Sequence, residues 1–213
     1  MSQIVPALLV SSEQEFEKNL RAVENNCSLI QVDVLDGTLF PNTTWHDSRS
    51  IGALKTHVQM EGHFMVENPI PLVEAFQRHV PTFARAIVSA EMHRPLGAIV
   101  GHIKDMLGLK VGVAINPETP LHEIEEVLHV IDQLTIMSVH PGYQGQLFDD
   151  TIFEKITQIR NHRPDLAIEI DGGVTDELIA PLLKAGVTNI CVGSLIFRSS
   201  NPTDKLKQLN TLL

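Results

Sequence analysis

The 213-residue chain has few basic residues, only two cysteines and no long apolar run. Lys and Arg together number 16 against 26 Asp and Glu, which gives a net charge of −10. This balance argues against a general nucleic-acid surface or an anionic-membrane binder. It does not exclude a small phosphorylated ligand, because backbone N–H groups hold phosphate without any Lys or Arg.

Three further absences concern the cellular compartment, membrane spans and dinucleotide binding. Cys27 and Cys191 lie far apart and form no cysteine framework, and the chain shows no signal peptide, so we expect a reducing, cytoplasmic location. No apolar run reaches the roughly 18 residues of a membrane span, so we expect no membrane partner. A six-residue glycine fingerprint of the dinucleotide type is also missing after the first β-rich run.

Short β-rich runs alternate with helical stretches along the chain. We expect strands at 4–10, 29–34, 58–66, 85–90, 109–116, 134–140, 166–171 and 189–194. We expect helices at 12–25, 48–56, 71–79, 95–106, 121–130, 151–161, 175–185 and 203–212. Eight strand–helix units in so short a chain predict an α/β fold, a closed (β/α)8 TIM barrel rather than an open sheet. We assign residues 1–213 to this single barrel domain.

Polar residues gather at the predicted carboxyl ends of the strands, where barrels of this kind carry their chemistry. Asp33, His63 and Asp171 are inward candidates at matching heights, and two carboxylates with an imidazole suit a divalent transition metal. Gln31 shares the face of Asp33, because strand side chains alternate with period two. The plainer alternative is that a strand-end Asp caps the next helix and that a lone His is structural.

Three glycine-containing stretches follow predicted strands. In "SVHPGYQGQLF" (138–148), Gly142 and Gly145 flank Tyr143–Gln144, which favours a lid over a plain turn. In "EIDGGVTDE" (169–177) and "CVGSLIF" (191–197), backbone N–H groups are placed to face an anion. Paired loops after strands seven and eight are where such barrels often hold phosphate.

From about residue 4 to residue 198, the chain resembles the ribulose-phosphate 3-epimerase family. The resemblance is carried by "VDVLDGTLFPN", "HFMVENP", "KVGVAINPETP", "IMSVHPGYQGQLF", "EIDGGV" and "CVGSLIF". It implies an isomerase of the pentose phosphate pathway: a metal-assisted epimerase that inverts C3 of a ketose phosphate, D-ribulose 5-phosphate to D-xylulose 5-phosphate or a close analogue. It also implies a homo-oligomer, a dimer or a hexamer.

The resemblance also implies roles for individual residues. Asp33 and Asp171 would exchange the C3 proton through an enediolate and bind a divalent metal (Zn, Fe, Mn or Mg), with His63 as a further ligand and Gln31 at a fourth ligand position. The apolar floor of the site would be Leu35, Met65 and Met137. Substrate and phosphate contacts would come from Gly142, Gly145, Gln146, Gly172, Gly173, Gly193 and Ser194.

The chain departs from the family pattern within the site. The family has His where Gln31 stands, and Ala7, Leu35, Glu61, Ser89 and His140 replace its Ser, Met, Asp, His and Asn or Glu. An amide oxygen is a poorer donor for zinc or iron than imidazole is, so Gln31 predicts weakened metal affinity or a shift towards Mn²⁺ or Mg²⁺. His140 is the one candidate to substitute, although it lies on a different strand.

Two other functions stay open from the sequence. The substitutions at the site also fit a non-catalytic or regulatory phosphosugar-binding relative that has lost full metal coordination. Barrel relatives that decarboxylate or condense phosphosugars use an Asp-x-Lys-x-x-Asp motif, and this sequence contains none. His63 stands where the lysine of that motif would lie.

Overall fold

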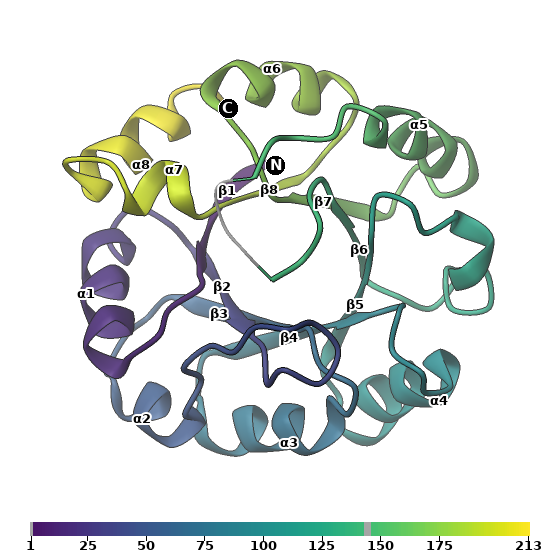
Figure 1. Ribbon diagram of the computed structural model, residues 1–213, viewed down its shortest axis with the longest axis horizontal. Helices are drawn as coiled ribbons and strands as arrows, with labels where there is room; N and C mark the ends of the chain where they lie inside the picture. The colour runs from purple at the N-terminus through teal and green to yellow at the C-terminus, as the bar shows by residue number, and fades with distance from the viewer. Residues whose placement is uncertain (1, 143–145) are drawn as a thin grey trace.

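A computed structural model describes residues 2–142 and 146–213, and in it eight parallel strands close into a barrel ringed by helices (Figure 1). The strand order follows the chain from β1 to β8, and β8 pairs with β1. The strands are β1 Gln3–Leu8, β2 Leu29–Val34, β3 Gln59–Phe64, β4 Phe83–Ser89, β5 Lys110–Ile115, β6 Gln133–Met137, β7 Ala167–Asp171 and β8 Asn189–Val192. The predicted (β/α)8 TIM barrel is confirmed.

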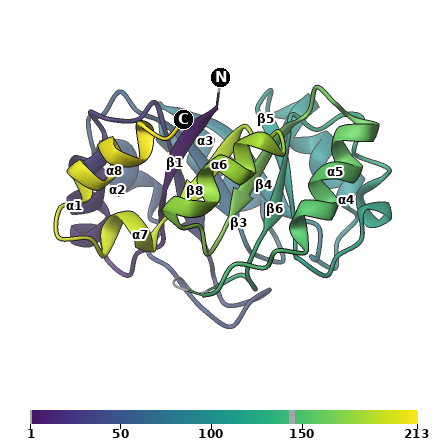
Figure 2. The same cartoon turned by 90° about the horizontal axis from the view of Figure 1, so that it is seen from above.

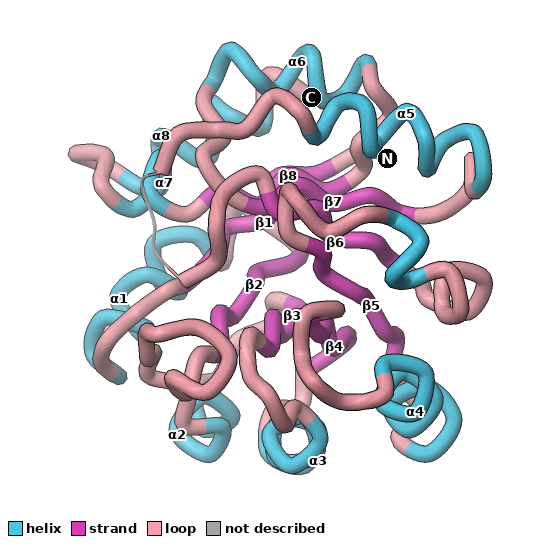
Figure 3. Tube along the Cα trace, turned by 45° about the vertical axis from the view of Figure 1, so that its right-hand side comes forward, coloured by secondary structure: helices cyan, strands magenta, loops and turns pink. Residues whose placement is uncertain are grey.

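The helices form the outer ring, drawn in cyan in Figure 3. They are α1 Glu13–Val23, α2 Ser48–Ala53, α3 Ile70–His79, α4 Leu96–Gly101, α5 Ile152–His162, α6 Asp176–Lys184, α7 Ser194–Phe197 and α8 Pro202–Asn210. A π-helical segment, His102–Met106, continues α4. Among the described residues, no helix has the length and apolar character needed to cross a membrane.

The segment 121–130 differs from its predicted helix. Only Leu121–Ile124 is helical there, as a 3₁₀ turn, and turns follow it. Ile124 and Val127 are both buried, and a three-residue spacing fits 3₁₀ geometry as well as the α-helical period. The short α7 was not predicted either, because it begins directly after β8 with only Gly193 between.

Local chemistry fixes several helix ends. The hydroxyl of Ser12 accepts from the backbone N–H of Glu15 and caps α1, which satisfies one of the free donors of the first turn. Gly186 follows α6 with φ +94°, and its N–H donates to the carbonyl of Leu183 at 2.9 Å. A left-handed residue after the last turn is the usual helix stop, and glycine adopts it without a Cβ penalty.

Apolar side chains fill the layer between barrel and helices. In β2, Ile30, Val32 and Val34 belong to this main core, whereas Gln31 and Asp33 alternate with them and point into the barrel. The predicted period-two pattern of this strand is therefore confirmed. Burying the alternate apolar face against helices leaves the inward face free for polar residues.

The barrel interior beneath the strand ends is polar, unlike the branched apolar layers usual in this fold. The Arg85 guanidinium donates to Glu61 at 2.7 Å and also to Gln133. The Thr135 hydroxyl donates to Glu169 at 2.9 Å. Glu61, Gln133, Thr135 and Glu169 are fully buried. These contacts tie β3, β4, β6 and β7 together under the site.

The loops after the strands gather at one end of the barrel, the lower edge in Figure 2, opposite the N-terminus. The loop after β2 folds back on itself through an isolated bridge between Asp36 and Thr43. The Thr44 hydroxyl donates to the carbonyl of Asp33 at 2.7 Å and accepts from the N–H of Leu35 at 3.0 Å. This loop therefore fixes the end of the strand that carries Asp33.

Candidate active site at the barrel mouth

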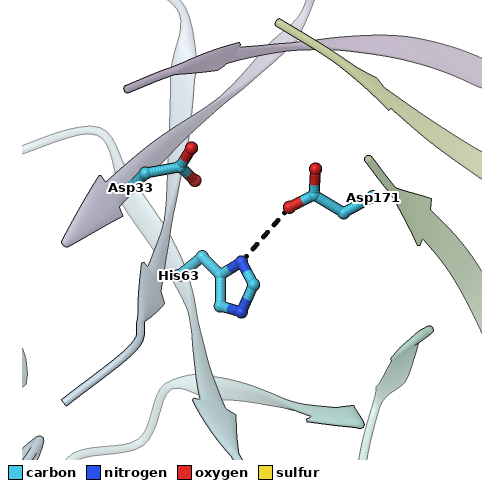
Figure 4. Close-up of side chains that lie close together, drawn as sticks. All are labelled: Asp33, His63 and Asp171. Atoms are coloured by element: carbon cyan, nitrogen blue, oxygen red, sulfur yellow. Dashed lines mark hydrogen bonds and ion pairs between the residues drawn. The ribbon is translucent and has the colours of Figure 1, made fainter. Parts of the chain in front are cut away.

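Asp33, His63 and Asp171 converge at the carboxyl ends of their strands, and their side chains point toward one another (Figure 4). Asp33 and His63 are direct neighbours in the register of β2 with β3, and Asp171 is the last residue of β7. One nitrogen or oxygen atom from each side chain lies within 4.8 Å of the others. The structure therefore brings together the three residues that the sequence singled out.

Hydrogen bonds hold these side chains in place. The Nδ1 atom of His63 lies 3.3 Å from Oδ2 of Asp171. The Nε2 group of Gln31 donates to Oδ1 of Asp33 at 2.8 Å and to Oδ2 of Asp171 at 2.7 Å. The carboxamide of Gln31 thus bridges the two aspartates, with its donor end toward them.

Burial and mutual repulsion alter the protonation of the site. Burial, followed by the nearby Asp171 carboxylate, raises the pKa of Asp33 from 3.8 to about 7, although His63 and Gln31 oppose the change. Burial alone would lower the pKa of His63, but the hydrogen bond and charge of Asp171, with the charge of Asp33, raise it overall. A carboxyl that titrates near neutrality both accepts and gives a proton readily.

The donor set fits a divalent cation. The Nδ1 atom of His63 is the ring nitrogen on the side of Asp171, whereas its buried Nε2 atom points away from the two carboxylates (Figure 4). Two carboxylates and an imidazole nitrogen make a mixed oxygen and nitrogen set that suits Zn²⁺, Fe²⁺ or Mn²⁺. Asp33, His63 and Asp171 are therefore the residues that would hold such an ion.

Gln31 lies beside this set, but its orientation differs from that of a ligand. A metal ligand must present the amide oxygen, since an amide N–H₂ group only donates. Here Oε1 points the other way and accepts from the Sγ–H of Cys191 at 3.2 Å. The carboxamide would have to turn by about half a rotation to offer its oxygen to an ion between the aspartates.

A second cluster, Glu61, Glu169 and Cys191, has its ligand atoms within 4.8 Å of one another, and its two glutamates stand two residues before His63 and Asp171 on β3 and β7. Burial raises the pKa of Glu61, with Arg85 opposing that change, and burial with the charge of Glu61 raises that of Glu169 well above its usual value. Arg85 supplies a fixed positive charge to this cluster. The cluster is therefore part of the polar interior that supports the site.

A cavity opens above the aspartates. Its lining includes Asp33, Asp171, Met65 and Met137, and the glycine-containing ends of β7 and β8 close it on one side. The predicted floor residue Leu35 is fully buried and is not among the lining residues. Met65 and Met137 thus provide the apolar surface that the sequence predicted there.

Backbone donors line the same cavity. The N–H groups of Gly172, Gly173 and Gly193 donate to no acceptor among the described residues. Gly172 and Gly173 have φ values of +113° and +60°, and a Cβ at position 172 would lie 2.4 Å from Val139. Only glycine fits there, so the backbone of this turn stays open to a ligand.

The remaining predicted residues lie around the mouth. Gly142 and Ser194 line the cavity, and Nε2 of Gln146 donates to the carbonyl of His140 at 2.7 Å. Gly145 and the rest of the predicted lid centre, Tyr143–Gln144, fall outside the described residues. His140 is mostly exposed and faces Glu118 at 3.5 Å, so it does not reach the Gln31 position.

Sequence reasoning gave Cys191 no role at the site. In the structure this residue is buried. However, it also lies opposite Asp171 in the register of β7 with β8 and lines the cavity. The signal was present in the period-two alternation, because Cys191 precedes Gly193 by two residues on an inward face.

Comparisons with known proteins agree with this geometry. The model of the ribulose-phosphate 3 epimerase family matches residues 3–197. A ribulose-phosphate 3-epimerase of Aquifex aeolicus is 30% identical over 224 residues, covering 100% of this chain and 97% of that protein. One from Rhodobacter capsulatus is 34% identical over 208 residues, covering 93% of this chain and 87% of the relative.

A solved structure matches the fold at much lower identity. The structure of 3-hexulose-6-phosphate synthase from Salmonella typhimurium superposes with a TM-score of 0.74 and 14% sequence identity. The match covers 99% of this chain and 98% of that chain. At this identity the likeness shows the barrel fold alone.

Proposed function

This chain belongs to the ribulose-phosphate 3 epimerase family and is an epimerase of the isomerase class, and from that premise we propose its reaction. It inverts C3 of a ketose phosphate, converting D-ribulose 5-phosphate to D-xylulose 5-phosphate or a close analogue. The observation that carries the proposal is the pair of carboxyls, Asp33 and Asp171, which reach one point from β2 and β7.

Each carboxyl acts on one face of the sugar. One takes the C3 proton, an enediolate forms, and the other returns a proton from the far side. The pKa of about 7 for Asp33 supports this use, because a group that alternates between acid and base works best near the operating pH. His63 beside Asp171 holds that carboxylate in orientation through the contact at 3.3 Å.

Removal of a proton next to a ketone builds negative charge on oxygen, and that charge must be stabilised. A divalent cation held by Asp33, His63 and Asp171 would supply Lewis-acid stabilisation of that negative charge. We propose Mn²⁺, Zn²⁺, Fe²⁺ or Mg²⁺ in this role. The Nδ1 atom of His63, which faces Asp171 at 3.3 Å, is the support for a nitrogen ligand there.

The phosphate lies at the other end of the cavity. The free N–H groups of Gly172, Gly173 and Gly193 and the hydroxyl of Ser194 are its donors. Backbone donors bind a phosphate without a basic side chain, which agrees with an acidic chain that uses a phosphorylated substrate. Met65 and Met137 exclude water from the carbon that reacts.

The experiment is exchange of the C3 hydrogen with solvent deuterium. Purified protein supplied with Mn²⁺ and D-ribulose 5-phosphate in D₂O is expected to incorporate deuterium at C3 and to form D-xylulose 5-phosphate. Asp33→Asn and Asp171→Asn should each slow epimerisation by about 100-fold or more. The exposed Asp165, which pairs with Arg163, supplies the matched control Asp165→Asn.

One outcome separates the proposal from its alternative. If the protein binds the ketose phosphate but no deuterium enters C3 with any of the four cations, the chain is a non-catalytic phosphosugar-binding relative. The bridge that Gln31 makes between the aspartates is the observation that favours that alternative, because it holds the site together without an ion.

We also propose that the enzyme works in a reducing compartment, the cytoplasm. Cys27 and Cys191 are both free thiols, and cysteines of cytoplasmic proteins stay reduced. Burial raises the pKa of the Cys27 thiol to about 12, so this group stays protonated and unreactive.

A further inference from the structure

The carboxamide of Gln31 is fully buried and uses both of its ends. Its Nε2 group donates to Asp33 at 2.8 Å and to Asp171 at 2.7 Å. Its Oε1 atom accepts from the thiol of Cys191 at 3.2 Å. Each of these three contacts favours the same orientation of the amide, donor end toward the aspartates.

This orientation places the amide in competition with a cation. Two hydrogen atoms with partial positive charge approach the same two carboxylates that would hold the ion, and hydrogen bonds to ionised groups are the strong ones. An N–H₂ group offers no lone pair to a metal. A cation shared by Asp33 and Asp171 must therefore displace at least one of these hydrogen bonds.

Cys191 makes that displacement harder. Its side chain is buried, and its Sγ–H donates to Oε1 of Gln31 at 3.2 Å. If the carboxamide turned to present Oε1 to an ion, that oxygen would lose its contact with Cys191. The thiol on β8 therefore stabilises the orientation in which the amide competes.

We propose that Gln31 is a positioning residue that holds Asp33 and Asp171 together in the absence of a cation and weakens cation binding by competition, rather than serving as a ligand. The inference rests on the proposed function, since it needs a cation site between the aspartates. It reverses the role that the sequence resemblance implies for this position. Removal of the amide should weaken cation binding if Gln31 is a ligand and should strengthen it if Gln31 is a competitor.

The test measures Mn²⁺ binding by calorimetry to the chelator-treated, full-length chain. Gln31→Met keeps the length of the side chain and removes the amide, and we expect it to bind Mn²⁺ about tenfold tighter than the wild type. Gln31→Glu, which offers an oxygen in the same volume, should bind tighter still. Gln133→Met is the matched control, because Gln133 is equally buried but contacts Arg85, Asn189 and Thr135 instead.

The outcomes are distinct. Weaker Mn²⁺ binding by Gln31→Met means that the amide is a ligand and overturns the proposal, as does affinity within twofold of the wild type. If neither the wild type nor Gln31→Glu binds Mn²⁺, Zn²⁺ or Fe²⁺, the cation part of the proposed function fails as well. Tighter binding by the Gln133→Met control would assign the effect to a general loosening of the barrel, and so would overturn the specific role of Gln31.

A measurement on the wild type avoids any dependence on folding of the variants. In the chelator-treated protein, the side-chain amide group of Gln31 can be observed in a nitrogen-15-edited proton NMR spectrum. Both of its protons should resonate downfield, as protons that are hydrogen-bonded to carboxylates do. Titration with diamagnetic Mg²⁺ or Zn²⁺ should move these signals. Side-chain amide signals typical of a solvent-exposed glutamine would overturn the bridge.

Discussion

At the scale of single residues, Asp33 shows how burial alters the protonation of a carboxyl. Its side chain is buried and lies close to Gln31, His63 and Asp171. The neutral form is therefore favoured in the folded state, relative to an exposed aspartate. Because the folded state favours the neutral form, the free energy of unfolding should depend on pH.

The free energy of unfolding of the chelator-treated protein should include a contribution from Asp33 that depends on pH. The folded pKa, about 7, lies above the reference value of 3.8, so the folded state binds the proton more tightly than the unfolded state does. This contribution is full below about pH 4 and is lost as the pH rises to about 7. Urea unfolding at intervals between pH 4.5 and 7.5 measures it.

Asp33→Asn is the comparison for that measurement, because the amide does not titrate. We expect the variant to lose less stability than the wild type across this range. Equal slopes in the two proteins would show that Asp33 does not carry the pH dependence. Each sample needs chelator, since a bound cation would favour the ionised carboxylate.

Most of the candidate site could be predicted from residue types and spacing, whereas the orientation of Gln31 could not. Asp33, His63 and Asp171 follow from strand alternation and from the rule that chemistry sits at the strand ends. The two ends of an amide have almost the same shape, so its orientation depends on its partners. The deciding partner, Cys191, is 160 residues away in the chain.

At the scale of elements, the strands were predicted closely and the helices less so. The strict alternation of inward and outward side chains in β2 leaves little freedom, and the predicted range 29–34 is the observed one. The segment 121–130 is a 3₁₀ turn followed by turns, and the three-residue spacing of its buried Ile124 and Val127 would fit an α-helix equally well. Helical patterns shorter than about three turns do not separate these conformations.

The packing of α2 against α3 gives a prediction for stability. A Cβ at Gly52 would lie 1.8 Å from the carbonyl oxygen of His79, so the two helices approach too closely for any side chain. Gly52→Ala should lower the free energy of unfolding by about 1–3 kcal/mol, as overpacking usually does. Urea unfolding followed by circular dichroism measures the change.

Gly101 provides the matched control within the helical ring. A Cβ there would meet only a side-chain oxygen of Asp105, at 3.9 Å. Because alanine loses less conformational entropy than glycine in a helix, Gly101→Ala should raise the free energy of unfolding by about 0.5–1 kcal/mol. Similar losses in both variants would mean that the helix–helix contact at Gly52 is not the cause.

At the scale of the whole molecule, the net charge of −10 opposes the approach of an anionic substrate. Donors at the site are short-range backbone groups, whereas the charge of the molecule acts over about 30 Å in 10 mM salt and about 8 Å in 150 mM salt. Added salt should therefore raise kcat/KM for the phosphosugar rather than lower it. The measurement compares initial rates at subsaturating substrate in 10 mM and 150 mM NaCl.

The sign of the change in kcat/KM with salt tells which charges dominate the approach of the substrate. A steep fall in kcat/KM with salt would mean that positive side chains near the mouth dominate the approach. Lys18 and Arg198, which line a neighbouring hollow, are the residues to replace by glutamine in that case. A neutral competitive ligand should show no salt dependence, which separates the charge effect from a change in the fold.

The closure of the barrel by β1 and β8 has a consequence for the two halves of the chain. The half that ends with β4 supplies Asp33 and His63, and the half that begins with β5 supplies Asp171 and the glycines that line the cavity. Neither half by itself contains both aspartates, the full set of Asp33, His63 and Asp171, or the whole lining of the cavity. Function in this molecule is therefore a property of the closed ring, and it arises only when the last strand meets the first.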